Sequence, residues 1–122
     1  MKAPDYFSPE AKYYFDFIVK TLEELGRLEE IDQPIIEGLA FNLALIRNAQ
    51  EMIMKEGIVV DALHGKKPHP AIEVLNQSQA KVNEAYKLLG LDSDTRMKIE
   101  QLKMDDLEND PVVKILRGDY ED

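Results

Sequence analysis

The sequence predicts an all-α protein of four to five helices, interrupted by one short β-hairpin or extended loop near residues 58–68. Apolar residues recur every three or four positions in several long stretches, which is the period of a helix with one buried face. Most stretches begin at a polar residue next to a proline and end at a glycine, the usual order of helix start and stop signals. With 122 residues, the chain has the length of one domain.

The first helix is predicted from about Pro9 to Leu25. Ser8 is its expected cap, and Gly26 ends it. An aromatic cluster extends more than half-way around this helix, so part of it must contact a second layer or another subunit. Core packing is favoured over a ligand-binding or base-stacking role. The cluster consists of Tyr13, Tyr14, Phe15 and Phe17.

A second helix of about six turns is predicted from Asp32, its expected cap, to Glu56, just before Gly57. Its apolar surface is too wide for a single neighbour, so we expect a helical hairpin that also packs against another chain. Asn42 and Arg47 lie within this surface, either as interfacial polar groups or at a solvated edge.

Residues 57–68 lack the helical pattern of the neighbouring stretches. Three consecutive β-branched residues precede a His-Gly turn signal there, which indicates a short β-hairpin or an extended loop. Lys66 and Lys67 form the only adjacent basic pair in the chain, at the expected tip of the hairpin. They indicate either a phosphate contact or a solvated tip. His64 and His69 flank this pair without a cysteine or a helical histidine spacing, so we expect no metal.

The next helix is predicted to open at Pro70 behind His69, its expected cap. Gly90 ends that helix, and Asp92 caps a further helix that contains Met97, Ile99 and Leu102. The stretch LGLDSD therefore ends one helix and begins the next.

The composition of the C-terminal region indicates a separate acidic segment. We divide the chain into a helical domain, residues 1–104, and a segment, residues 105–122, in which Asp110 and Pro111 start a short helix before an acidic end. This segment either docks onto a partner, or it packs against its own domain or is disordered.

Composition excludes several classes of protein. Cysteine is absent, which excludes disulfides and cysteine-based zinc sites. The N-terminal residues are charged and aromatic where a signal peptide requires an apolar run, and no segment approaches the roughly 20 apolar residues of a membrane span. The net charge is −9, and only residues 58–90, with four basic and three acidic side chains, are not acidic.

No catalytic motif is present in the sequence. It contains no phosphate-binding loop, no nucleophile elbow and no His-Glu zinc motif. Asp92 and Asp94 form an acid pair, but both lie at a helix start, where acids are expected as caps. We therefore expect a binding or assembly protein without a cofactor rather than an enzyme.

Several stretches, in the same order and at matching spacing from about Ser8 to Ile99, resemble the small subunits of phage terminases. They are SPEAKYYF, LEELGRLEEIDQPIIEGLA, KEGIVV, KKPHPAI and LGLDSDTRMKI. The resemblance implies an all-helical subunit that assembles into a closed ring in the host cytoplasm. It also implies that this ring recognises double-stranded viral DNA and delivers it to a large subunit carrying the ATPase and nuclease.

Under this resemblance, three sets of residues receive roles. The expected DNA contacts are Lys66 and Lys67, with Lys2, Lys12 and Lys20 as weaker candidates. The expected subunit interface consists of Tyr14, Phe15, Ile18, Leu22, Ile36, Leu39, Leu43, Ile46 and Ile53. The expected large-subunit contact consists of Leu107, Val112, Val113, Ile115 and Leu116. The alternative is a small acidic adaptor or inhibitor that binds another protein without nucleic acid.

Overall fold

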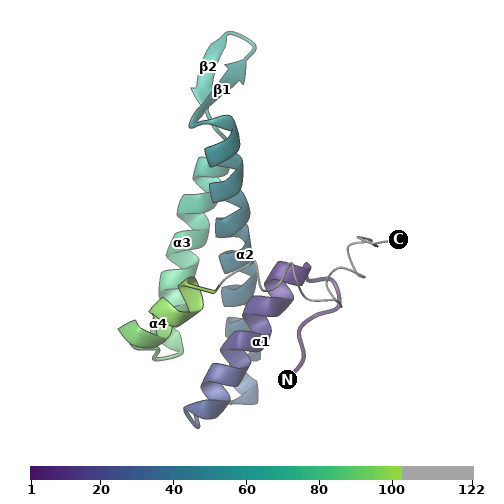
Figure 1. The fold of residues 1–122 in the computed structure, drawn as a ribbon, viewed down its shortest axis with the longest axis vertical. Helices are drawn as coiled ribbons and strands as arrows, with labels where there is room; N and C mark the ends of the chain where they lie inside the picture. The colour runs from purple at the N-terminus through teal and green to yellow at the C-terminus, as the bar shows by residue number, and fades with distance from the viewer. Residues whose placement is uncertain (103–122) are drawn as a thin grey trace, which may run out of the picture.

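A computed structural model describes residues 1–102 as a helical protein with one small β-hairpin, as predicted (Figure 1). The fifth helix expected after Asp110 lies outside these residues. The elements are α1 (Pro9–Glu24), a 3₁₀ turn (Glu30–Asp32), α2 (Gln33–Glu56), β1 (Val59–Ala62), β2 (Gly65–Pro68), α3 (Ala71–Leu88) and α4 (Ser93–Glu100).

The ends of α1 follow the predicted signals. The Ser8 hydroxyl accepts a hydrogen bond from the Ala11 amide at 3.2 Å, which satisfies one of the free N–H groups at the helix start. At the other end, Gly26 adopts the left-handed conformation with φ of 67°, and the Arg27 amide donates to the Leu22 carbonyl at 2.8 Å.

The start of α2 confirms the predicted position of Asp32 but not a capping hydrogen bond from its side chain. Asp32 precedes the helix, but it already has helical dihedrals as the last residue of the 3₁₀ turn, and its side chain makes no capping hydrogen bond. The turn orients the chain so that the carboxylate does not reach the free amides. The predicted end is confirmed, because α2 stops at Glu56 and Gly57 has a φ of 88°.

The α3–α4 corner follows the predicted stop and restart. Gly90 has a φ of 65°, and the Leu91 amide donates to the Tyr86 carbonyl at 3.0 Å. Asp92 Oδ1 accepts from the Thr95 amide at 2.8 Å, and this backbone hydrogen bond lowers the pKa of the Asp92 carboxyl.

The long helices α2 and α3 run antiparallel, α1 packs along the first half of α2, and α4, which follows the turn after α3, contacts α1 (Figure 1). We call residues 1–47 and 79–102 the base. All of the largest fully buried side chains belong to it: Phe15, Ile18, Leu22, Ile36, Leu39, Val82 and Ile99. In the predicted aromatic cluster, Tyr14 and Phe15 are buried and Tyr13 and Phe17 are half-buried, which confirms core packing.

The remainder of the described chain, residues 48–78, projects from the base as a thin arm that ends in the β-hairpin (Figure 1). Its buried residues are Ala49, His69, Ala71 and Ser78, whereas its exposed large apolar residues are Met52, Met54, Ile58, Val59, Leu63 and Val74. The arm has two layers and no core of its own. Within residues 1–102, no helix has both the length and the apolar character needed to cross a membrane.

Candidate nucleic-acid interface on the arm

The β-hairpin at the tip of the arm carries the predicted basic pair. The strands β1 and β2 are antiparallel, and Ala62 faces Gly65 across a two-residue turn formed by Leu63 and His64. Both turn residues are exposed, and Leu63 retains 91% of its accessible surface. The tip therefore presents an apolar side chain beside the two lysines.

The strand geometry separates the two lysines. Lys66 is paired in register with Asp61, and Lys67 with Val60. Since successive side chains of a strand point to opposite faces, the adjacent basic residues lie on different faces of the hairpin. Lys66 forms an exposed ion pair with Asp61, which offsets its charge. Sequence reasoning did not find this separation, although the alternation of a strand implies it.

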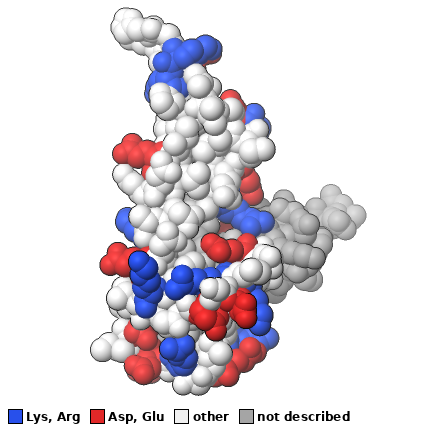
Figure 2. Space-filling view, turned by 90° about the vertical axis from the view of Figure 1, so that its left-hand side faces the viewer, with Lys and Arg blue, Asp and Glu red and all other residues white. Residues whose placement is uncertain are grey.

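Lys67 lines a groove of about 590 Å³ where the hairpin meets the helices. The groove is lined mainly by apolar side chains, with one cation and two acids at its edge. Its lining residues are Leu45, Asn48, Ala49, Met52, Glu56, Val60, Asp61, Lys67, His69, Pro70, Ala71 and Val74. In Figure 2, cationic side chains lie at the tip of the molecule, above a broad area with few charged side chains.

His69 is buried at the elbow between the hairpin and α3. Its Nδ1 accepts a hydrogen bond from the Ala71 amide at 3.0 Å, so the side chain caps α3 as predicted, although the helix begins one residue later than expected. Because Nδ1 is an acceptor, the ring proton lies on Nε2, which donates to Glu56 Oε2 at 2.9 Å. The backbone N–H of His69 donates to the Ile58 carbonyl at 2.8 Å. One residue thus joins the last residue of α2, the residue before β1 and the first residue of α3.

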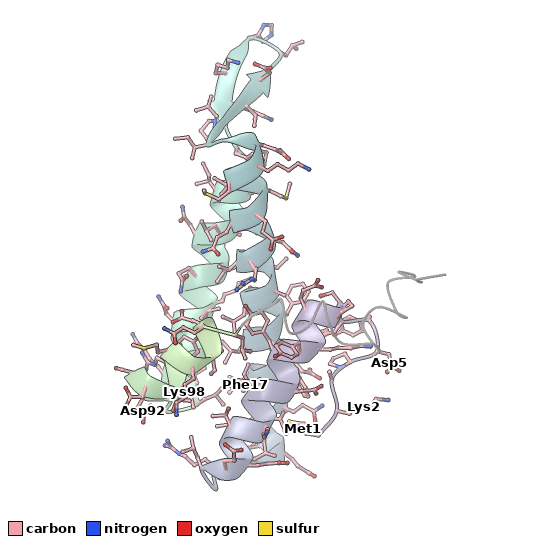
Figure 3. The ribbon with its side chains drawn as sticks, in the orientation of Figure 1. Met1, Lys2, Asp5, Phe17, Asp92 and Lys98 are labelled. Carbon is pink, nitrogen blue, oxygen red and sulfur yellow. The ribbon has the colours of Figure 1, made fainter. Side chains whose placement is uncertain are left out.

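The remaining predicted DNA contacts lie on the base. Lys2 forms an exposed ion pair with Asp5 at 3.5 Å, beside α1 (Figure 3). Lys12 and Lys20 lie on α1. Burial raises the pKa of the Asp16 carboxyl above its usual value, and the nearby charge of Lys12 offsets part of this rise. The structure does not bring these lysines together with Lys66 and Lys67.

Two arginines that the sequence did not single out stabilise the α3–α4 corner. Arg27 donates from Nη1 to the Gly90 carbonyl at 2.9 Å, and Arg96 donates from Nε to the Leu91 carbonyl at 2.8 Å. The Arg96 guanidinium also lies 5.3 Å from the centre of the Tyr86 ring. Asp92 and Lys98 mark this corner in Figure 3. Both guanidinium groups are therefore engaged in contacts that stabilise the fold.

Most residues predicted to form the subunit interface lie inside the base. Ile53 is half-buried, and the other eight are buried: Tyr14, Phe15, Ile18, Leu22, Ile36, Leu39, Leu43 and Ile46. Their side chains are covered by the chain itself, and a role in subunit contact stays a prediction. The predicted large-subunit contacts, Leu107, Val112, Val113, Ile115 and Leu116, lie outside the described residues. Across residues 1–102, no group of three or more histidine or acidic side chains could hold a metal ion.

Comparison with known proteins identifies a family. The family described as phage terminase, small subunit, matches residues 11–106, which is most of the chain. No curated protein and no solved structure is similar enough to match. Within residues 1–102, the matched region includes the α-helices α1 to α4 apart from the first two residues of α1, together with the whole arm.

Proposed function

We propose that this chain, which belongs to the phage terminase small-subunit family, is the subunit that recognises viral double-stranded DNA and delivers it to a separate large subunit for packaging. The observation that carries this proposal is the family match over residues 11–106. Membership supports a role in phage genome packaging, and small subunits of this family are generally not catalysts. The ATPase and nuclease are then functions of the large subunit.

The arm supplies the DNA contact in this proposal. Its tip is exposed and carries two cations, whereas Lys2 lies beside α1 and Lys20 on α1. Lys66 is partly neutralised by Asp61, so Lys67 is the stronger candidate for a phosphate contact. One such contact per chain is weak at physiological salt, because phosphate contacts are screened by counterions.

Assembly of several copies resolves this weakness. A closed homo-oligomeric ring repeats each tip by symmetry, and contacts that are weak singly add through effective concentration. A ring is therefore part of the proposal, with residues 105–122 as the segment that binds the large subunit. That segment is acidic and would be repelled by DNA phosphates, so the DNA contact is assigned to the tip of the arm and not to this segment.

Charge reversal at the tip tests the DNA contact. We expect Lys67→Glu to weaken binding of a double-stranded DNA fragment more than Lys66→Glu does, and the double variant to weaken it most. Loss of one phosphate contact makes the slope of log K against log salt less negative by about 1. The measurement is fluorescence anisotropy of labelled DNA over a series of salt concentrations.

The matched control is Lys98→Glu, which makes the same charge change on α4 in the base. It should leave the salt slope unchanged. If the double variant at the tip binds DNA with the wild-type affinity and slope, the arm tip is not the DNA contact.

A second candidate function is supported by the net charge of −9. An acidic adaptor that binds a protein through its apolar arm needs no phosphate contacts. Such an adaptor retains no DNA at any salt concentration, with or without a large subunit.

A further inference from the structure

The most exposed large apolar side chain of residues 1–102 lies at the tip of the β-hairpin. Leu63 retains 91% of its accessible surface and is not part of the core cluster. Figure 1 shows the turn between β1 and β2 at the end of the arm furthest from the base. In Figure 2, uncharged side chains form the outermost point of the molecule, beyond the cations at the top of the arm. The arm therefore ends in an apolar side chain that the rest of the described chain leaves in solvent.

The turn itself provides no reason for a leucine at this position. Tight turns favour Gly, Pro, Asn, Asp and Ser. Neither Leu63 nor His64 has a positive φ, and the unusual backbone conformation is taken by Gly65, with a φ of 130°. A small polar residue at position 63 would fit the same turn and would avoid exposing apolar surface to water. A binding partner that covers Leu63 accounts for its presence.

Cations flank Leu63 on both faces of the hairpin. Lys66 and Lys67 are consecutive residues of β2, so their side chains point to opposite faces of the ribbon. The backbones of paired strands are only about 4.8 Å apart, which makes the ribbon narrow. Residues 58–68 carry two basic side chains and one acidic side chain, whereas the whole chain has a net charge of −9. The tip is therefore locally cationic.

The minor groove of double-stranded DNA matches this arrangement. It is about 6 Å wide and has a row of phosphates along each side. An apolar tip can enter a base step at its floor, while a cation on each face of the ribbon contacts one of the two phosphate rows. Leucine is one of the side chains that proteins use as such wedges. The exposed ion pair between Lys66 and Asp61 contributes little, so a phosphate can replace the carboxylate.

We propose that Leu63 inserts as a wedge between two base pairs from the minor groove and kinks the duplex at the point where the hairpin binds. This inference rests on the proposed function and gives a binding mode to its DNA contact. Minor-groove wedges partly unstack a base step and bend DNA by about 20–90° toward the major groove. Unstacking is easiest at pyrimidine–purine steps such as TA and CA, so the hairpin should prefer sites that contain them.

The composition of the hairpin favours this indirect readout over other uses of an exposed leucine. Residues 58–68 contain no arginine, asparagine or glutamine, three of the side chains that form bidentate contacts with base edges. A pocket on a protein is the competing partner for Leu63, but such a pocket does not require a cation on each side. Charge complementarity with two phosphate rows therefore favours DNA.

The test measures DNA bending separately from DNA affinity, with the full-length protein and with and without the large subunit. A duplex of about 30 base pairs with a central TA step carries a donor and an acceptor dye at its two ends, so that bending raises energy transfer. We expect the wild type to raise the energy transfer, Leu63→Ala to lose most of this rise, and Leu63→Met to recover it, because methionine keeps an apolar wedge. The salt slope of binding should be the same for all three, since no phosphate contact changes.

The matched control is Leu88→Ala, the same substitution at a leucine that is 62% exposed on α3 in the base. It should bend DNA as the wild type does. A duplex with a mismatched central base pair gives a second readout, because its unstacking costs less. The wild type should bind it about tenfold more tightly than the matched duplex, whereas Leu63→Ala should show little preference. Circular dichroism verifies that all variants are folded.

The outcomes separate this inference from the proposed function. DNA binding by the wild type without bending, or equal bending by the wild type and Leu63→Ala, overturns the inference and leaves the proposed function intact. A Leu63→Ala variant that bends DNA normally but loses its affinity for the large subunit, or forms a smaller oligomer, also overturns it, because the tip then contacts a protein. A wild type that binds no DNA at any salt, with or without the large subunit, contradicts the proposed function and this inference with it.

Discussion

Replacing His69 by alanine removes the joint between the β-hairpin and the helices α2 and α3. The substitution deletes the cap on the Ala71 amide, which contributes about 1 kcal/mol. It also deletes the hydrogen bond to Glu56, whose half-exposed carboxylate limits the loss to about 0.5–1 kcal/mol. Loss of the buried ring adds about 1 kcal/mol. The free energy of unfolding should therefore fall by about 2–3 kcal/mol.

For a chain of this size, that loss lowers Tm by about 6–12 °C, measured by circular dichroism. The Ile58 carbonyl accepts from the His69 amide, so we also expect faster hydrogen exchange at His69 and in the β-hairpin. His64→Ala is the matched control, since His64 is exposed at the tip and should leave Tm unchanged.

Two further variants divide the effect between the ring nitrogens. In His69→Asn, the amide oxygen takes the place of Nδ1 and should recover the cap on Ala71. In His69→Gln, the amide nitrogen takes the place of Nε2 and should recover the contact with Glu56. Each should lie between the wild type and His69→Ala in stability. Equal Tm values for His69→Ala and His64→Ala would refute the role of His69 as the joint.

Two other predictions concern the α3–α4 corner. The Asp92 carboxyl has a lowered pKa because it accepts from Thr95, so its stabilising effect is present above its unfolded pKa of 3.8 and is lost as pH falls through the lower folded value. Acid unfolding curves should show this loss for the wild type and not for Asp92→Ala, and identical curves would contradict it. Gly90→Ala should lower the free energy of unfolding by about 1–2 kcal/mol in urea titrations, because φ is 65° and the new Cβ would lie 2.8 Å from Arg27 Nη2. An unchanged urea midpoint would show that the corner tolerates a side chain.

Local signals predicted much of the fold. Ser8, Gly57, Gly90 and Asp92 mark helix ends in the structure as the sequence indicated, because capping and left-handed turns depend on a few neighbouring residues. Asp32 takes its predicted position before α2, but its side chain makes no capping hydrogen bond, because the residue has the helical dihedrals of the 3₁₀ turn. A turn of that kind has no clear signal in the sequence.

The candidate site was less predictable. The sequence identified Lys66 and Lys67, but the ion pair with Asp61 depends on the register of the hairpin, which the turn determines. The apolar surface of α2 is broad, so periodicity alone did not separate residues of the core, such as Leu39, from residues that contact another subunit. Only the placement of α1 and α3 makes that distinction.

Retention of DNA is the most direct test of the proposed function. Filter binding of a labelled double-stranded fragment at low salt, with and without the large terminase subunit, separates a packaging subunit from an acidic adaptor. The proposed function requires that the protein retains DNA in at least one of these conditions, with a retention that falls as salt increases. No retention in either condition would contradict it and favour the adaptor.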